Sequence, residues 1–243
     1  MSVRVEQLTR LYGEQVAVNC ISFEIPKGEV VGFLGPNGAG KSTTMKMITG
    51  YLPPSSGRAL VCGLDAQENS MEARKKIGYL PESNPLYFDM YVREYLEFLA
   101  GIHRLGQGTA KRIEELLDQT GLRPESHKKI GALSKGYKQR VGIAQAMLHD
   151  PEVLILDEPT SGLDPNQIVE IRDLIRHFGQ EKTVILSTHI MQEVEAMCQR
   201  VLIIRKGSLV ADDALSNLRM QHPGMNLEDI FRTLTLEKQV VNE

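Results

Sequence analysis

A glycine-rich stretch near the N-terminus has the residue types and spacing of a phosphate-binding loop. Residues 35–42 read Gly-Pro-Asn-Gly-Ala-Gly-Lys-Ser and match the P-loop pattern G-x-x-x-x-G-K-[ST]. Glycines let successive backbone N–H groups point at one anion, and a helix beginning there adds partial positive charge. We expect Lys41 to reach the β- and γ-phosphates of a nucleotide and the Ser42 hydroxyl to ligate Mg²⁺. The alternative is a glycine-rich turn with a surface lysine. The predicted nucleotide-binding residues here are Gly35, Pro36, Asn37, Gly38, Ala39, Gly40, Lys41, Ser42 and Thr43.

Two adjacent carboxylates could complete such a site. Asp157 and Glu158 directly follow the apolar run 153–156. At the end of a buried strand, Asp157 would hold Mg²⁺ and Glu158 would orient or deprotonate a water that attacks the γ-phosphate. Taken alone, the pair would indicate a buried strand that ends in a solvated acidic turn. The P-loop favours the catalytic interpretation.

These residues need elements that bring them together. The first third of the chain predicts strands over 3–8, 16–25, 29–34 and 57–62, with a helix over 41–48. Apolar residues at helical spacing predict a mostly helical middle, with one helix around 92–99, another around 113–117 and a third over 135–149. The last third alternates strands over 153–156, 183–187 and 201–205 with helices over 165–178 and 190–198. Strands that alternate with helices indicate a parallel α/β sheet.

Composition excludes several protein classes. The chain has 243 residues, 42% hydrophobic and 24% charged, which argues against a disordered, collagen-like or coiled-coil protein. The net charge of −3 does not favour a nucleic-acid binder with one large basic face. No apolar run approaches the roughly 20 residues of a membrane span, and the N-terminus lacks signal-peptide features. Cys20, Cys62 and Cys198 form no C-x-x-C pair, so we expect a reduced cytosolic protein without a zinc site.

Four further motifs carry a family resemblance. Residues 133–140, Leu-Ser-Lys-Gly-Tyr-Lys-Gln-Arg, resemble the LSGGQ signature of ABC ATPases, and residues 161–164, Ser-Gly-Leu-Asp, resemble their D-loop. His189 resembles the switch histidine that follows a strand, and Tyr12 the adenine-stacking aromatic of the A-loop. The guanine-binding pattern N-K-x-D of GTPases does not occur. In this order the motifs cover nearly the whole chain, which resembles the ATP-binding subunits of ABC transporters.

That resemblance implies the fold. We expect an α/β P-loop NTPase of the ABC ATPase class, with a parallel α/β core, an N-terminal antiparallel β subdomain and a helical subdomain. A single ABC ATPase domain would span 1–243. Its core and β subdomain would cover about 1–81 and 151–220, its helical subdomain about 82–150, and a C-terminal helical tail about 221–243.

The resemblance also implies ATP hydrolysis with Mg²⁺ by a homodimer or heterodimer of such chains. Each ATP would lie between the P-loop of one chain and Ser134, Lys135 and Gly136 of the other. The expected catalytic residues are Lys41, Glu158 and His189, and the expected metal ligands are Ser42, Asp157 and Glu82. The partners would be integral membrane transporter subunits on separate chains, with this chain cytoplasmic and peripheral on the inner face of the membrane. No nucleic acid is expected.

Four stretches narrow the resemblance. Residues 77–82, 84–87, 125–131 and 187–195 are similar to the gliding-motility-associated ABC transporter ATPases of Bacteroidetes, which are of the ABC-2 type. The alternative is a soluble ABC ATPase that acts on nucleic acid in repair or translation. Such chains usually carry two cassettes or long coiled-coil insertions, and this chain has one cassette. A P-loop kinase is disfavoured by the signature and the D-loop.

Some residues depart from the pattern or allow a second interpretation. The signature has Lys135 in place of Gly and Tyr137 in place of Gln, and Glu82 stands where many relatives have Gln. His189 and Glu193 are four residues apart, but without a third ligand we interpret this spacing as coincidence. The apolar run 86–92 could cover the helical core or dock a membrane partner. Apolar residues between 227 and 234 predict a helix that packs on the body, with Asn226 as N-cap.

Overall fold

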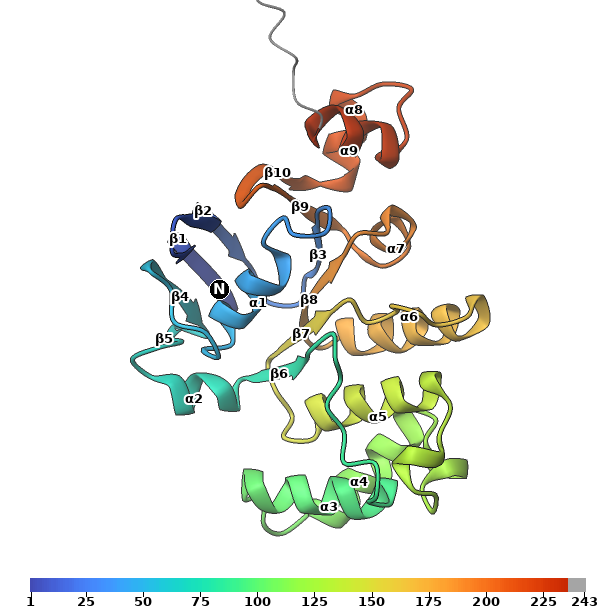
Figure 1. Cartoon of the computed structure of the whole chain (residues 1–243). Helices are drawn as coiled ribbons and strands as arrows, with labels where there is room; N and C mark the ends of the chain where they lie inside the picture. Colours follow the sequence, from blue (N-terminus) through green and yellow to red (C-terminus); the bar gives the residue numbers. More distant parts are fainter. Residues whose placement is uncertain (236–243) are drawn as a thin grey trace, which may run out of the picture.

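Two β-sheets form the centre of the computed structural model, which describes residues 1–235 (Figure 1). The first is an antiparallel sheet in the order β2-β1-β4-β5, with strands β1 (Val3–Tyr12), β2 (Gln15–Ile25), β4 (Ser56–Val61) and β5 (Leu64–Asp65). The second has the order β10-β9-β3-β8-β7-β6, with strands β3 (Val30–Leu34), β6 (Ile77–Leu80), β7 (Val153–Asp157), β8 (Thr183–Thr188), β9 (Arg200–Arg205) and β10 (Ser208–Ala214). Its strands are parallel except β10, which pairs antiparallel with β9.

Nine α-helices lie within the described residues. They are α1 (Lys41–Ile48), α2 (Ser70–Lys75), α3 (Val92–His103), α4 (Thr109–Gln119), α5 (Lys135–Met147), α6 (Pro165–Gly179), α7 (Met191–Met197), α8 (Leu215–Gln221) and α9 (Leu227–Thr235). Two short 3₁₀ turns, η1 (Arg123–Glu125) and η2 (Ile130–Ala132), precede α5. None of the helices between residues 1 and 235 has the length and apolar character that a membrane crossing needs.

Alternate residues of the parallel sheet belong to two separate cores. On β7, Val153 and Ile155 pack into the cluster that contains α1 and the antiparallel sheet. Leu154 and Leu156, pointing the other way, join the cluster that contains α5, α6 and the helical region. Because both faces are covered, all five residues of β7 are buried and the strand is apolar up to its last residue. The carboxyl end of this strand is therefore held firmly by packing on both sides.

The helices α3, α4 and α5 form their own layer at the opposite end of the molecule from β1 and β2 (Figure 1). Leu96, Ile113 and Leu116 are fully buried there. The layer is joined to the sheet where α5 packs on β6: a Cβ at Gly78 would lie 2.2 Å from the Ala146 carbonyl oxygen, so only glycine permits this approach. The expected arrangement of a parallel α/β core, an N-terminal antiparallel sheet and a helical region is confirmed.

Most predicted elements are present within two or three residues of their expected bounds, although β1 and α3 end four residues later than predicted and α4 begins four residues earlier. The predicted C-terminal helix is α9, whose first turn is capped: the Asp229 N–H donates to Asn226 Oδ1 at 2.8 Å. It packs on the body through Leu227 and Ile230, as expected. The tail predicted over 221–243 is described up to Thr235, and residues 236–243 lie outside the described residues. The sequence did not predict β5, α2, β6, β10 or α8.

Candidate nucleotide site

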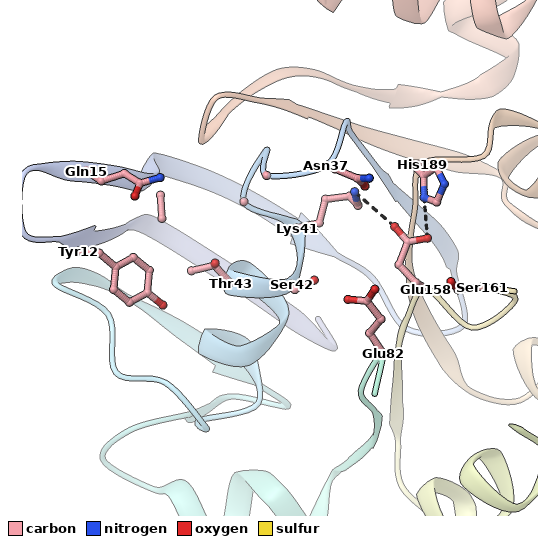
Figure 2. Close-up of a pocket in the computed structure, with 13 residues that line it drawn as sticks. Tyr12, Gln15, Asn37, Lys41, Ser42, Thr43, Glu82, Glu158, Ser161 and His189 are labelled. Atoms are coloured by element: carbon pink, nitrogen blue, oxygen red, sulfur yellow. Dashed lines mark hydrogen bonds and ion pairs between the residues drawn. The ribbon is translucent and has the colours of Figure 1, made fainter. Parts of the chain in front are cut away.

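A cavity of about 590 Å³ opens between the start of α1, the end of β7 and the first sheet (Figure 2). Ten of the predicted site residues line it: Tyr12, Asn37, Gly38, Gly40, Lys41, Ser42, Thr43, Glu82, Glu158 and His189. Gln15 and Ala17 also line it and were not predicted, and so does Ser161, the first residue of the D-loop motif. In Figure 2 Tyr12 and Gln15 lie at one end of the cavity, and Glu158 and His189 at the other.

The loop between β3 and α1 is shaped by its glycines. Gly38 and Gly40 have φ of +76° and +108°, in the left-handed region that favours glycine. A Cβ at Gly40 would lie 2.5 Å from the Ala17 carbonyl oxygen, and one at Gly35 would lie 2.6 Å from that of Ile204. The loop is therefore pressed against two neighbouring strands, and larger residues would force it open.

Lys41, the first residue of α1, points into the loop. Its side chain is 6% exposed, and its ammonium donates to the carbonyl oxygens of Gly35 at 2.8 Å and Pro36 at 3.3 Å. The same nitrogen lies 3.4 Å from Glu158 Oε1. A buried cation surrounded by oxygens beside a helix N-terminus is suited to bind a phosphate group.

Asp157 ends β7 and is 1% exposed. Ser42 Oγ donates to Asp157 Oδ1 at 3.1 Å, and Ser187 Oγ donates to the same oxygen from the neighbouring strand β8. A hydroxyl and a carboxylate within hydrogen-bond distance supply the hard oxygen ligands that Mg²⁺ prefers, and Mg²⁺ in nucleotide sites needs only one or two protein ligands besides phosphates. The donor set therefore fits Mg²⁺. Glu82 lines the same cavity.

Glu158 adopts a left-handed backbone conformation, with φ of +50°. Its N–H donates to the Ser187 carbonyl oxygen at 3.1 Å, which holds the turn against β8. The side chain is 9% exposed, with Oε1 facing Lys41 and Oε2 lying 2.9 Å from His189 Nδ1 (Figure 2). The turn thus brings a carboxylate, an ammonium and an imidazole to the same end of the cavity.

Tyr12 lies at the end of β1 and is 46% exposed, so it is not a core residue. The guanidinium of Arg10 lies 4.7 Å from the centroid of its ring. An exposed aromatic ring at the mouth of the cavity offers a surface on which a base could stack.

The signature residues lie outside this cavity. Ser134 caps α5 by accepting from the Tyr137 N–H at 3.4 Å, and together with Gly136 it lines a separate cavity of about 310 Å³. Lys135 lines a third cavity, of about 450 Å³. Glu82, Glu158 and Ser161 line both this third cavity and the 590 Å³ cavity, which we call the nucleotide cavity. A single chain therefore does not bring Ser134 and Gly136 to its own P-loop.

The side chains of Glu193 and His189 contact different partners. It is fully buried, and its carboxylate accepts from the hydroxyls of Thr160 and Thr188. These two hydrogen bonds give the Glu193 carboxylate a structural role separate from that of His189. Among the described residues, no cluster of three or more His, Cys, Asp or Glu side chains could hold a metal.

Comparison with known proteins identifies the family. The model of the ABC transporter family matches residues 18–161, and a model of an AAA domain matches residues 129–195. The bacitracin transport ATP-binding protein BcrA of Bacillus licheniformis is 39% identical over 242 residues, covering 98% of this chain and 78% of that protein. The ABC transporter ATP-binding protein NatA of Bacillus subtilis is 39% identical over 218 residues, covering 88% and 89%.

Solved structures agree. An ATP-binding subunit of an ABC transporter superposes with a TM-score of 0.87 at 30% identity, covering 96% of this chain and 99% of that one. A dimeric ATP-binding cassette in a post-hydrolysis state, bound to ADP and Pi, has a TM-score of 0.79 at 26% identity, covering 88% and 98%. The chain belongs to the ABC transporter family, as an ATP-hydrolysing nucleotide-binding domain.

Proposed function

We propose that this chain powers an ABC-2 type membrane exporter, binding and hydrolysing ATP at the cytoplasmic face of the membrane. The observation that carries this proposal is the convergence of Lys41, Ser42, Asp157, Glu158 and His189 around one end of the cavity. Export is supported by the names of relatives, among them a Nod factor export ATP-binding protein of Burkholderia pseudomallei, 36% identical over 228 residues.

In this proposal the P-loop holds the triphosphate. Backbone N–H groups of the loop and the N-terminus of α1 face the phosphates, and the Lys41 ammonium exchanges its bonds to Gly35 and Pro36 for phosphate oxygens. Tyr12 stacks on the adenine at the other end of the cavity. Ser42 and Asp157 would hold Mg²⁺, with Glu82 beside them. When bound, the metal offsets the charge of the β- and γ-phosphates.

Hydrolysis needs a water held in line with the γ-phosphate. Glu158 orients this water and accepts its proton as the water oxygen attacks the γ-phosphorus, while the bond from that phosphorus to the β–γ bridging oxygen breaks and ADP leaves. His189, 2.9 Å from Glu158 Oε2, fixes the direction of the carboxylate and places a ring nitrogen next to the reacting group. Lys41 stabilises the negative charge that develops on the phosphate oxygens.

A second chain would complete the site. Because Ser134 and Gly136 line a different cavity from the P-loop, they would contact the nucleotide on a partner chain. Lys135 adds a positive charge at the N-terminus of α5, where a cation alone is unfavourable but a phosphate offsets the cost. The partner could be a second copy or a related subunit.

Some residues of the segment 86–92 cover the helical core, and others are free to dock a membrane partner. Leu86 and Val92 are buried in the helical core, whereas Tyr87, Phe88 and Tyr91 are 58%, 55% and 48% exposed. We call these last three residues the aromatic face. Three exposed aromatic side chains between residues 87 and 91 fit a protein contact, and we assign this contact to the membrane subunits.

The proposal is tested by purifying the chain from membranes solubilised in detergent. A multispan membrane protein should copurify, and Mg²⁺-dependent ATPase activity should be lost in Lys41→Ala. Copurification of nucleic acid without a membrane protein would contradict it. The narrower assignment to gliding motility rests on the four stretches 77–82, 84–87, 125–131 and 187–195. A deletion strain of a gliding host that still glides on agar would remove that assignment.

A further inference from the structure

Glu193 is a buried carboxylate for which the hydrolysis steps above give no role. It lies in the first turn of α7 and has no exposed surface. Thr188 Oγ1 donates to its Oε2 at 2.6 Å, and Thr160 Oγ1 donates to its Oε1. Removing a carboxylate from water is costly, and here two hydroxyl donors from distant parts of the chain compensate for it.

The two threonines flank the reacting groups. Thr160 follows Glu158 by two residues and is 2% exposed, and Thr188 directly precedes His189. Thr188 Oγ1 also accepts from the Ile190 N–H at 3.1 Å, so the same hydroxyl holds the backbone on both sides of His189. Glu193 thereby joins the segment that carries Glu158 to the segment that carries His189.

His189 needs such support because its own side chain is 46% exposed. An exposed imidazole is free to change rotamer unless its backbone and its partner are both fixed. Charge-assisted hydrogen bonds are shorter and stronger than neutral ones, so a carboxylate is an effective link between two loops.

We propose that Glu193 is a positioning residue for ATP hydrolysis, which aligns Glu158 with His189 by tying Thr160 to Thr188. The inference rests on the roles proposed above for Glu158 and His189. The alternative is that Glu193 serves only the fold, as an acidic residue in the first turn of α7 that favours the helix N-terminus.

The test removes one hydroxyl and keeps its volume. Thr160→Val deletes the donor to Glu193, and we expect the single-turnover rate with radiolabelled ATP to fall about tenfold with unchanged nucleotide affinity, because a small misalignment costs rate rather than binding. The matched control is Thr183→Val, on β8 and equally buried, whose hydroxyl donates to Ser2 at the other end of the strand. Its rate should stay within about twofold of wild type.

A double-mutant cycle separates positioning from stability. If Glu193 acts through the Glu158–His189 pair, Thr160→Val should cost less than about twofold in a His189→Ala background, since the alignment no longer matters there. An equal, tenfold cost in both backgrounds would overturn the inference. Glu193→Gln, which keeps one acceptor oxygen, should recover part of the rate lost in Glu193→Leu. If Glu193→Leu does not fold, the threonine variants decide the matter.

Failure of the proposed function gives a different pattern. Wild-type rates in both Glu158→Gln and His189→Ala would overturn the roles of those residues, and this inference with them. Slow hydrolysis in those two variants, together with a wild-type rate in Thr160→Val, would overturn the role of Glu193 alone.

Discussion

Glu158, the residue proposed to orient the attacking water, has a strained backbone conformation. A non-glycine residue with φ near +50° costs about 1–3 kcal/mol and persists only where neighbouring contacts fix it. Here the Ser187 backbone and hydroxyl both accept from its N–H, and Lys41 and His189 hold its carboxylate. Asp157 needs no such turn because it is still part of β7. The side chains of these adjacent residues thus have different partners, Ser42 and Ser187 for Asp157 and Lys41 and His189 for Glu158.

Tyr12 gives a prediction for nucleotide affinity. Because its ring is exposed at the mouth of the cavity, Tyr12→Ala should weaken ATP binding by about 1–3 kcal/mol through loss of stacking. Tyr12→Phe should bind almost as wild type, since it keeps the ring face. Titration with a fluorescent ATP analogue measures both. Equal affinity in the alanine variant would show that the base does not stack there.

Strand order explains why the sequence predicted the site well. The strands β3, β7 and β8 are buried on both faces, so each reads as an apolar run, and parallel pairing brings their carboxyl ends to one edge. The P-loop and the Asp157–Glu158 pair could therefore be placed together from the sequence alone. The roles assigned to those residues remain predictions.

Other features had no local signal. The strand β6 has only four residues and contains Gly78, which permits close packing but has a low propensity for strands. The strand β10 is a partly exposed edge strand that contains two aspartates. The partners of Glu193 are Thr160, 33 residues away in the turn after β7, and Thr188, five residues away on β8. Folding of the chain brings these side chains together, and no periodic pattern in the sequence predicts their contact.

The junction between α5 and β6 gives a prediction for pH. His149 follows α5, and its ring stacks on His103 with centroids 4.3 Å apart and donates from Nε2 to the Ile77 carbonyl oxygen at 2.9 Å. Burial lowers the pKa of His149 to about 4 and also lowers the pKa of His103. Both rings are therefore neutral in the native state at pH values where they take up protons in the unfolded chain.

Stability should consequently fall as the pH falls from about 6.5 toward 4, because the unfolded state binds more protons. In His149→Gln, which can keep a donor to Ile77, the loss of unfolding free energy between about pH 7.5 and pH 5 should be smaller than in wild type. Urea unfolding at the two pH values measures it. Equal losses in the two proteins would contradict the assignment.

Glu82 connects the nucleotide cavity to the surface assigned to the membrane partner. It lines the nucleotide cavity and also the third cavity, where Leu86 and Phe88 lie. Without a bound cation, the carboxylates of Glu82, Asp157 and Glu158 would repel one another. The positive charge of Mg²⁺, which binds with ATP, would offset this repulsion. We expect Glu82 to move toward bound Mg²⁺–ATP and away after hydrolysis, which would pass the nucleotide state to the aromatic face.

This coupling predicts different behaviour in two variants. Glu82→Gln should keep most basal ATPase activity, since its amide oxygen still contacts metal or water. Glu82→Ala should bind ATP but lose stimulation by the membrane subunits. ATPase rates of both, alone and with the reconstituted partner, measure the effect. Full stimulation of Glu82→Ala would mean that the loop does not transmit the nucleotide state.

Two copies of the chain, or this chain and a related subunit, should close over ATP, which Glu158 then helps to hydrolyse. Glu158→Gln keeps the size of the side chain but removes the base, so hydrolysis should slow by about 10²-fold or more while ATP still binds. The decisive measurement is the molar mass of this variant by light scattering, with Mg²⁺–ATP and with Mg²⁺–ADP. We predict about twice the chain mass of 27.1 kDa with ATP and a monomer with ADP. A monomer with ATP, in a variant shown to bind it, would contradict the account.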